Sequence, residues 1–245
     1  LEEIYVYEDN FVCDKDHWDT GSAKRVIELA MWASESVPFD PMEKSLHAVY
    51  GKFSNKDLRP KFQMEKEYPL AGRPPSMTHV FADDKGHRII AAKGAIENIL
   101  TKCKLPELTK MRINDIASEM AKKGFRILAV AKGIWNDSPL PGTADEFSYE
   151  FSGLTAFFDP PKPGIAHLFN IFQKAGIKVK IITGDNPLTT QAIALQAGLK
   201  EADFTIDGGK LLALRDTELK KILFKVSIYT RMFPKAKLKV INALK

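Results

Sequence analysis

The sequence predicts an α/β chain that folds as two domains. With 245 residues, of which 44% are hydrophobic, it is long enough for two hydrophobic cores. The second half alternates short apolar strands with helices, as a doubly wound parallel sheet does, whereas the first half carries a hairpin signal typical of an antiparallel sheet. We therefore expect a first domain over residues 1–158, a hinge over 159–163 and a second domain over 164–245.

In the first domain, helical spacing of apolar residues predicts helices, and short apolar runs predict strands. The expected helices span 20–32, 41–50, 95–100 and 108–123, and the expected strands span 78–81, 88–91, 125–134 and 153–158. The run Asp83-Asp84-Lys85-Gly86 predicts a turn between two of the strands, and Gly124 ends the fourth helix. Residues 136–143 are rich in turn formers and predict a loop. This domain is expected to be α+β around an antiparallel sheet.

Three prolines in the segment Asp159-Pro160-Pro161-Lys162-Pro163 separate the two halves. Proline removes backbone donors and keeps the residue before it extended, so the segment predicts a stiff hinge.

The second domain is expected to contain four helices and three strands that follow one another closely. A helix begins after Pro163, with apolar residues at 165, 168, 169 and 172, and ends at Gly176. The remaining elements are expected at 179–182 (strand), 187–197 (helix), 204–206 (strand), 217–223 (helix), 226–229 (strand) and after Pro234 (helix). The expected sheet lacks strands at both ends, which indicates an incomplete domain.

The segment from 178 to 187, KVKIITGDNP, ends an apolar strand in Thr183-Gly184-Asp185-Asn186 and turns into a helix. A strand of this kind is typically buried on both faces of a parallel sheet, and ligands bind beyond its carboxyl end. Asn186 can cap the helix with Pro187 at its first position, which leaves free N–H groups near the Thr183 hydroxyl. The segment suits phosphate binding, and the alternative is an ordinary strand-to-helix turn.

Composition narrows the classes of partner. The net charge is +5 and the pI is about 9.0, but basic residues are interspersed with acidic ones over most of the chain, so we expect no nucleic-acid binding. Attraction for a nucleotide polyphosphate is the favoured use of the positive charge. No run reaches the ~18 apolar residues of a membrane span. The two cysteines and five histidines show no metal-binding spacing, so no metal-ligating residue is expected.

Six motifs, in order along the chain, resemble those of P-type cation-transporting ATPases. They are FDPMEKSL, KGA at 93–95, KGFRILAVA, FFDPPKPG, TGDN at 183–186 and YTRMFPKAKLKVI. Each motif alone is weak, but together in this order they are specific. The resemblance covers nearly the whole chain, is closest to the calcium-like branch of bacteria, and implies a nucleotide-binding domain followed by a partial phosphorylation domain of the haloacid-dehalogenase type.

For the first domain, the resemblance implies a nucleotide pocket. Lys93 would reach into it, Gly94 would let the backbone approach the adenine, and Glu43 would hydrogen-bond near the base. Arg126 would act on the phosphate side, and Leu128 would pack against the base. Leu70 falls where relatives often carry a stacking aromatic residue, and Pro75 falls where they carry a lysine, so stacking is expected to be weak.

For the second domain, the resemblance implies a phosphoryl-group site. Thr183 would donate to the transferring phosphoryl group, and Lys237 would neutralise developing charge. Gly184, Asp185 and Arg231 would meet the nucleotide.

Each of these residues also has a structural interpretation. Lys93 could be a strand-end lysine that extends to solvent, and Arg126 could form an ordinary surface ion pair. Glu43 could simply stabilise the first turn of a helix, and Lys235 or Lys239 could take the role given to Lys237.

The family's DKTGT nucleophile motif and its GDGxND magnesium motif are absent from this sequence. We therefore expect a cytoplasmic fragment of an integral protein of the plasma or inner membrane, with ATP and Mg²⁺ as cofactors and the main Mg²⁺ ligands outside this chain. Its partners would be the membrane and actuator domains of the same polypeptide and the transported cation. The fragment alone should be inactive. The alternatives are a soluble phosphatase of the haloacid-dehalogenase type and a non-catalytic nucleotide-binding module.

Overall fold

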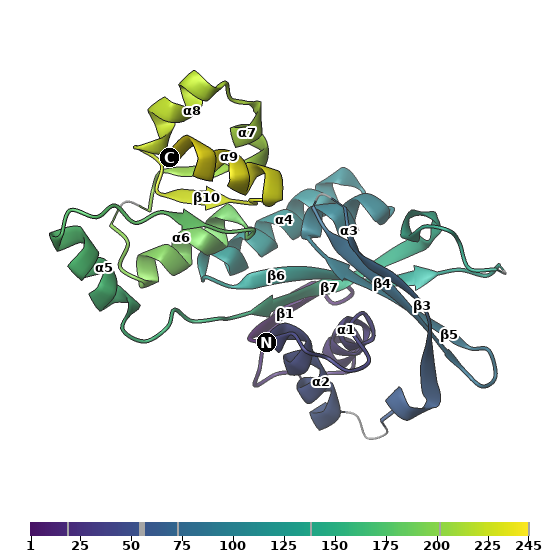
Figure 1. The fold of residues 1–245 in the computed structure, drawn as a ribbon. Helices are drawn as coiled ribbons and strands as arrows, with labels where there is room; N and C mark the ends of the chain where they lie inside the picture. The colour runs from purple at the N-terminus through teal and green to yellow at the C-terminus, as the bar shows by residue number, and fades with distance from the viewer. Residues whose placement is uncertain (19, 54–56, 73, 138, 201, 245) are drawn as a thin grey trace. The chain divides into compact units, whose positions relative to one another are not determined.

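The computed structural model describes the whole chain except residues 19, 54–56, 73, 138, 201 and 245. The predicted loop at 136–143 therefore includes one residue that lies outside the described part. The chain divides into two compact units (Figure 1), which are described separately. The first unit contains residues 1–117 and 127–157, and the second contains residues 118–126 and 158–245.

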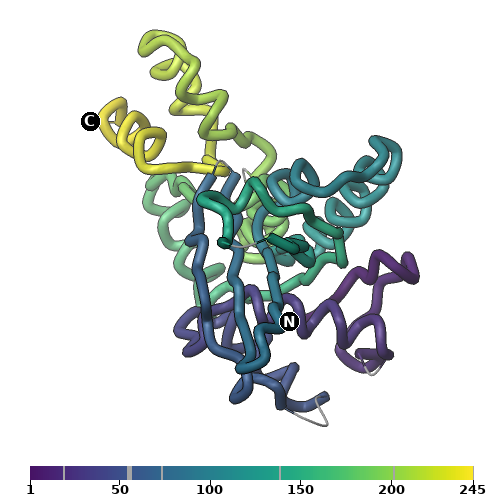
Figure 2. Tube along the Cα trace, turned by 90° about the vertical axis from the view of Figure 1, so that its right-hand side faces the viewer, coloured from purple at the N-terminus to yellow at the C-terminus, as the bar shows by residue number. Residues whose placement is uncertain are grey.

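A seven-stranded sheet forms the first unit, with the strand order β2-β1-β7-β6-β5-β4-β3. The strands are β1 (Glu3–Val6), β2 (Phe11–Asp14), β3 (Phe62–Ala71), β4 (Ser76–Asp83), β5 (Arg88–Gly94), β6 (Arg126–Ile134) and β7 (Ser148–Phe157). β1 pairs antiparallel with β2 and β7, and β3 to β6 pair antiparallel in succession. Figure 2 shows the chain from a direction at right angles to that of Figure 1. The expected antiparallel sheet is confirmed.

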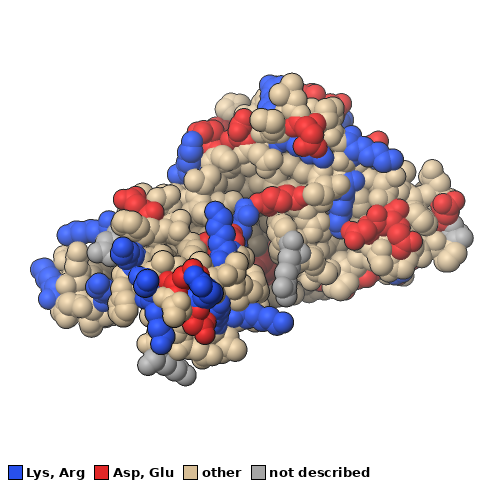
Figure 3. Space-filling model, turned by 90° about the horizontal axis from the view of Figure 1, so that it is seen from above, with Lys and Arg blue, Asp and Glu red and all other residues tan. Residues whose placement is uncertain are grey.

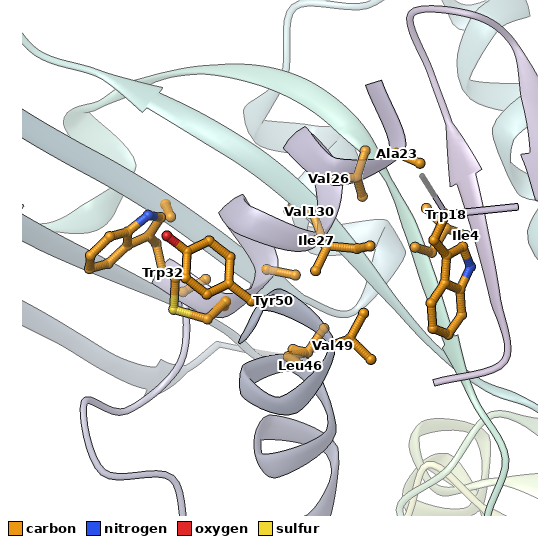
Figure 4. Packing of buried hydrophobic residues seen from close by; sticks show 14 of the residues in the cluster. Ile4, Trp18, Ala23, Val26, Ile27, Trp32, Leu46, Val49, Tyr50 and Val130 are labelled. Carbon is orange, nitrogen blue, oxygen red and sulfur yellow. The ribbon is translucent and has the colours of Figure 1, made fainter. Parts of the chain in front are cut away.

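Helices cover both faces of this sheet (Figure 1). They are α1 (Gly21–Trp32), α2 (Pro41–Phe53), α3 (Ile96–Lys102) and α4 (Glu107–Lys122), with 3-10 turns at Arg59–Lys61 and Ala144–Glu146. α1 and α2 pack on one face, where Ile27 and Leu46 face the sheet residue Val130 in the largest core (Figure 4). The Thr20 hydroxyl caps α1 by accepting from the Ala23 N–H at 3.3 Å.

Three strands of this sheet were not expected from the sequence. β1 and β2 have four residues each, too few for a clear alternation of apolar and polar residues. β3 lies at the sheet edge, where six of its ten residues are exposed and exposed residues alternate with half-buried ones over its first half. Pro69 near its end also argued against a strand, although an edge strand tolerates proline.

The second unit contains a three-stranded parallel sheet in the order β8-β10-β9. Its strands are β8 (Ile181–Ile182), β9 (Thr205–Asp207) and β10 (Ile228–Thr230), and its helices are α5 (Ile165–Lys174), α6 (Pro187–Gln196), α7 (Gly208–Ala213), α8 (Asp216–Leu223) and α9 (Pro234–Leu244). The parallel pairing confirms the prediction, whereas α7 was not expected because its sequence GGKLLA opens with two glycines.

One expectation for this unit is wrong. The strand that leads to Thr183 was expected to be buried on both faces, but Ile181 and Ile182 are only half-buried. β8 is the edge strand of the sheet, and the neighbouring α5 has no fully buried residue. None of the helices in the described ranges is long and apolar enough to cross a membrane.

Candidate functional site

Lys93 and Glu43 form a buried ion pair in the first unit. Lys93 lies on β5 and Glu43 in the first turn of α2, and their side chains are 6% and 9% exposed. The Lys93 ammonium donates to Glu43 Oε1 at 2.6 Å and to Ser34 Oγ at 2.6 Å. Lys93 therefore does not extend to solvent, and Glu43 does more than stabilise the first turn of a helix.

Burial and the neighbouring carboxylate shift the pKa of Lys93 in opposite directions. Burial lowers the pKa of Lys93, and the hydrogen bond and charge of Glu43 act to raise it. Only one of the two carboxylate oxygens of Glu43 is used, because Oε2 is buried without a hydrogen-bond partner. A buried acceptor of this kind costs free energy unless a donor reaches it. The cluster therefore contains one buried acceptor, Glu43 Oε2, that no donor among the described residues reaches.

Gly94 ends β5 opposite Ser76 on β4. A Cβ at position 94 would lie 2.5 Å from the Cα and Cβ of Ser76 and 2.7 Å from the carbonyl oxygen of Pro75. The chain's own backbone therefore already requires glycine here, independently of any ligand.

Two predicted base contacts lie on different parts of the sheet. Leu70 is near the end of β3, and 62% of its surface is exposed. Leu128 on β6 is half-buried against the core formed by α1 and α2, and its carbonyl oxygen accepts from the Thr155 hydroxyl at 3.3 Å. Leu70 is therefore free to contact a ligand, while Leu128 already contributes to the core.

The predicted strand-turn-helix motif is present in the second unit. Asn186 caps α6, with its Oδ1 accepting from the Leu188 N–H at 2.8 Å, and Pro187 occupies the first helical position. The Thr183 hydroxyl donates to Asp185 Oδ2 at 2.8 Å and accepts from the Asp185 N–H at 3.1 Å. Gly184 between them is exposed, and a Cβ there would approach no atom closer than 3.9 Å.

Arg126 begins β6 but belongs to the second unit, where its guanidinium lies 2.9 Å from Asp185 Oδ1. The two side chains are 41% and 30% exposed. Both carboxylate oxygens of Asp185 are therefore used, one by Arg126 and one by Thr183. These three predicted residues lie together, and the surface ion pair that was the alternative for Arg126 does exist.

Arg231 holds an unusual backbone conformation, with φ at +48°. Its N–H donates to the Asp185 carbonyl oxygen at 3.0 Å, which fixes it beside the Thr183 turn. A non-glycine residue in this region stores about 1 kcal/mol or more of strain, and such strain concentrates at functional sites. Its side chain lies 3.9 Å from Asp207 Oδ2, at the limit of an ion pair.

The structure separates the three lysines that could fill the role given to Lys237. Lys239 donates to the carbonyl oxygens of Leu212 and Leu214, so its ammonium is already bonded to the backbone at the C-terminal end of α7. Lys237 and Lys235 are exposed on α9. Lys239 is thereby removed from the candidates.

Sequence reasoning missed Ser34 and Asp40. Ser34 is 1% exposed and joins α1 to the Lys93 ammonium, since its hydroxyl also donates to the Ala30 carbonyl. Asp40 Oδ1 accepts from the N–H groups of Met42 and Glu43, which places Glu43. Asp40 precedes a proline at the start of a helix, which is a readable N-cap signal, whereas nothing in the sequence marks Ser34.

Neither the surface hollow nor the surface charge distribution distinguishes the predicted site residues. A hollow of about 860 Å³ is lined by the Phe62 end of β3 and the Asp83 end of β4, and it contains none of the predicted site residues. On the face shown in Figure 3, Lys and Arg side chains lie beside Asp and Glu side chains.

Comparison with known families gives two matches. Residues 35–164 match the family described as P-type ATPase, cytoplasmic domain N, and residues 127–245 match the family of haloacid dehalogenase-like hydrolases. The first match contains Glu43, Lys93 and Arg126, and the second contains Thr183 and Lys237.

Similar curated proteins agree with these matches. A sodium/potassium exporting P-type ATPase of Schizosaccharomyces pombe is 30% identical over 84% of this chain, and a calcium-transporting ATPase of Lactococcus lactis is 32% identical over 83%. A magnesium-transporting P-type ATPase of Escherichia coli is 27% identical over 78%. The aligned part of this chain covers 22%, 25% and 22% of these three relatives, respectively. The chain belongs to the P-type cation-transporting ATPases.

Proposed function

We propose that this chain provides the ATP-binding site and part of the phosphorylation site of an ATPase that moves a cation across a membrane. The observation that carries the proposal is the buried cluster of Ser34, Glu43 and Lys93, of which Glu43 and Lys93 lie in the region that matches domain N. The first unit would hold the nucleotide, and the second would hold the phosphoryl group. A soluble phosphatase leaves this cluster and the domain N match without a role.

For the nucleotide, the unpartnered Oε2 of Glu43 supports an acceptor for the adenine amino group. Lys93 would keep that carboxylate positioned, and the exposed Leu70 would cover one face of the base. A leucine offers apolar contact without the roughly 0.5–1.5 kcal/mol that aromatic stacking adds.

For the phosphoryl group, Thr183, Gly184 and the start of α6 provide a hydroxyl and N–H groups close together. Asp185 connects this turn to Arg126 and, through its carbonyl oxygen, to Arg231. The exposed ammonium of Lys237 supplies a positive charge on the same unit. These groups can stabilise charge during transfer to a nucleophile that this sequence does not contain.

Magnesium is implied by the family, but the residues of the second unit do not fit a complete site. Both Asp185 oxygens are engaged by protein groups, and among the residues described in that unit no three His, Cys, Asp or Glu side chains lie together. Mg²⁺ prefers six oxygen ligands.

The proposed role of Glu43 can be tested by comparing the binding of ATP and GTP to a Glu43 variant. Glu43→Gln keeps the side-chain shape and the acceptor for Lys93, but it can place an amide donor where Oε2 accepts. If Oε2 receives the adenine amino group, ATP binding measured by calorimetry should weaken about tenfold, as the loss of one buried hydrogen bond predicts. The preference for ATP over GTP should narrow, because guanine carries an acceptor at the corresponding atom.

Glu107→Gln is the matched control, because Glu107 is also a carboxylate in the first turn of a helix but is exposed. Its ATP affinity should equal that of the parent chain. Equal ATP affinity in Glu43→Gln and Glu107→Gln would remove Glu43 from the site. The chain should also incorporate no acid-stable phosphate from labelled ATP with Mg²⁺, and incorporation would contradict the assignment of the nucleophile to another segment.

A further inference from the structure

Glu35, Glu67 and His79, none of which has a role in the sites described so far, lie together in the first unit. One ligand atom from each of the three side chains lies within 4.8 Å of the others. Glu67 on β3 and His79 on β4 are direct cross-strand partners, and Glu35 lies in the segment between α1 and α2. The segment between α1 and α2 and the paired strands β3 and β4 thus bring two carboxylates and an imidazole close together.

His79 supplies the observation that distinguishes this cluster from ordinary surface acids. The residue is 0% exposed, and its Nε2 has no hydrogen-bond partner. Its Nδ1 lies 3.0 Å from the carbonyl oxygen of Ser34. A carbonyl only accepts, so Nδ1 carries the proton in the neutral ring, and Nε2 presents a lone pair.

This arrangement is the one that metal-binding histidines use. A ligating imidazole nearly always donates its other N–H to a carbonyl or carboxylate, which fixes the tautomer and the ring orientation. The carbonyl of Ser34 accepts that hydrogen bond from His79. Ser34 follows the end of α1 and is held there because its hydroxyl donates to the Ala30 carbonyl oxygen. The ring is therefore oriented before any ion arrives.

We propose that Glu35, Glu67 and His79 bind a divalent transition-metal ion, with Zn²⁺ as the probe. The imidazole favours Zn²⁺ and similar ions over Mg²⁺ or Ca²⁺, which prefer oxygen ligands throughout. Three protein ligands leave a fourth position for water. Bonds of about 2.1 Å place tetrahedral ligands roughly 3.4 Å apart, so the carboxylates must move inward. Glu67 is exposed and Glu35 half-buried, which gives both side chains room to do so.

The consequence for the fold is a cross-link. An ion held by these residues would tie the α1–α2 segment to the β3–β4 hairpin, next to Ser34 and therefore next to the Lys93 cluster. Such a site stabilises the first unit by mass action, because the unfolded chain does not hold the three ligands together. It does not depend on nucleotide binding.

The test uses the whole chain, treated with EDTA, desalted and titrated with Zn²⁺ by calorimetry at pH 7. We expect one site and a rise in the unfolding temperature with Zn²⁺ concentration. Glu67→Gln removes a ligand charge from an exposed side chain, so its fold is retained. His79→Asn keeps a donor for the Ser34 carbonyl and removes only the Nε2 lone pair.

Loss of a direct ligand should cost at least the roughly 10–100-fold that loss of an outer-shell partner costs. Glu67→Gln and His79→Asn should each lose that much affinity, whereas Glu150→Gln, an exposed strand carboxylate on β7, should retain the parent affinity. If His79→Asn fails to fold, Glu35→Gln takes its place beside Glu67→Gln. Absence of a site in the parent chain, or undiminished affinity in Glu67→Gln, would overturn the proposal.

Discussion

The first unit buries its charged site residues, with Lys93 and Glu43 side chains 6% and 9% exposed, whereas the second leaves Arg126 and Asp185 41% and 30% exposed. Both pairs are close, at 2.6 Å and 2.9 Å. In the first unit the pair is enclosed by a seven-stranded sheet and two helices, while in the second the sheet has three strands of two or three residues. Residues of one proposed function are thus part of the core in one unit and part of the surface in the other.

This difference determines what a substitution reports. A change at the first site alters the stability of its unit as well as binding, because removal of one partner leaves a buried charge. A change at the second site alters a solvated turn, where water replaces lost partners at little cost. The three tryptophans, at positions 18, 32 and 135, all belong to the first unit, so their fluorescence follows that unit alone.

The largest expected effect is that of Lys93→Ala. It leaves the Glu43 carboxylate buried without its cation and should lower the free energy of unfolding of the first unit by about 3–5 kcal/mol. Urea unfolding followed by tryptophan fluorescence measures this. The double variant Lys93→Met with Glu43→Leu removes both charges and should recover most of the loss. A loss below about 1 kcal/mol in Lys93→Ala would mean that the pair behaves as a surface pair.

The two glycines predicted as ligand contacts provide a matched comparison. Gly94→Ala places a Cβ 2.5 Å from Ser76 and should cost about 1–3 kcal/mol, as overpacking does. Gly184→Ala meets nothing closer than 3.9 Å and should change stability by less than about 0.5 kcal/mol. Chemical denaturation of both variants, followed by fluorescence and by circular dichroism, tests this. Equal costs would show that the two units do not differ in packing at these positions.

As pH rises, the stability of the first unit should begin to fall at a lower pH than that of the second unit. Burial raises the pKa of the Cys103 thiol to about 12 and that of Cys13 to about 11, both from 9.0. The unfolded chain releases these protons at lower pH than the folded chain, so stability falls as pH rises above about 9. In the second unit burial raises the pKa of Tyr229 from 10.0 to about 12. The stability of the second unit should therefore begin to fall at a pH about 1 higher than that of the first unit.

Urea midpoints of the tryptophan signal between pH 8 and 10 measure this, and Cys103→Ala should show a shallower decline than the parent chain. The slope with pH is compared, because the cavity left by the substitution lowers the midpoint at every pH. A decline of equal slope in both chains would show that Cys103 does not contribute.

The elements that the sequence predicted well are those with local signals. The Asn186 cap, the turn after Asp83 and the helix ends at Gly124 and Gly176 depend on residues close to each other in the chain. β3 was missed because its half-exposed pattern arises from its place at the sheet edge, which only the fold determines.

The same distinction applies to the candidate site. The motifs predicted Lys93, Glu43, Thr183 and Asp185 as candidates, because short sequence patterns carry them. Ser34 and His79 were not predicted, since their buried contacts are with residues 59 and 45 positions away. That the Lys93 ammonium faces Glu43 rather than solvent also depends on how α2 packs against β5, which no local pattern shows.

The smallest expected effect is that of Arg126→Met. The substitution retains an apolar stem and removes the charge that pairs with Asp185, and the carboxylate then meets water at its 30% exposed surface. The unfolding free energy should fall by less than about 1 kcal/mol, and most of that difference should vanish in 1 M salt, where charges are screened beyond about 3 Å. Hydrogen exchange of the β8 and β10 amides measures it in the unit that has no tryptophan. A salt-independent loss of several kcal/mol would place Asp185 in an interior environment, and the contrast with the Lys93 pair would then fail.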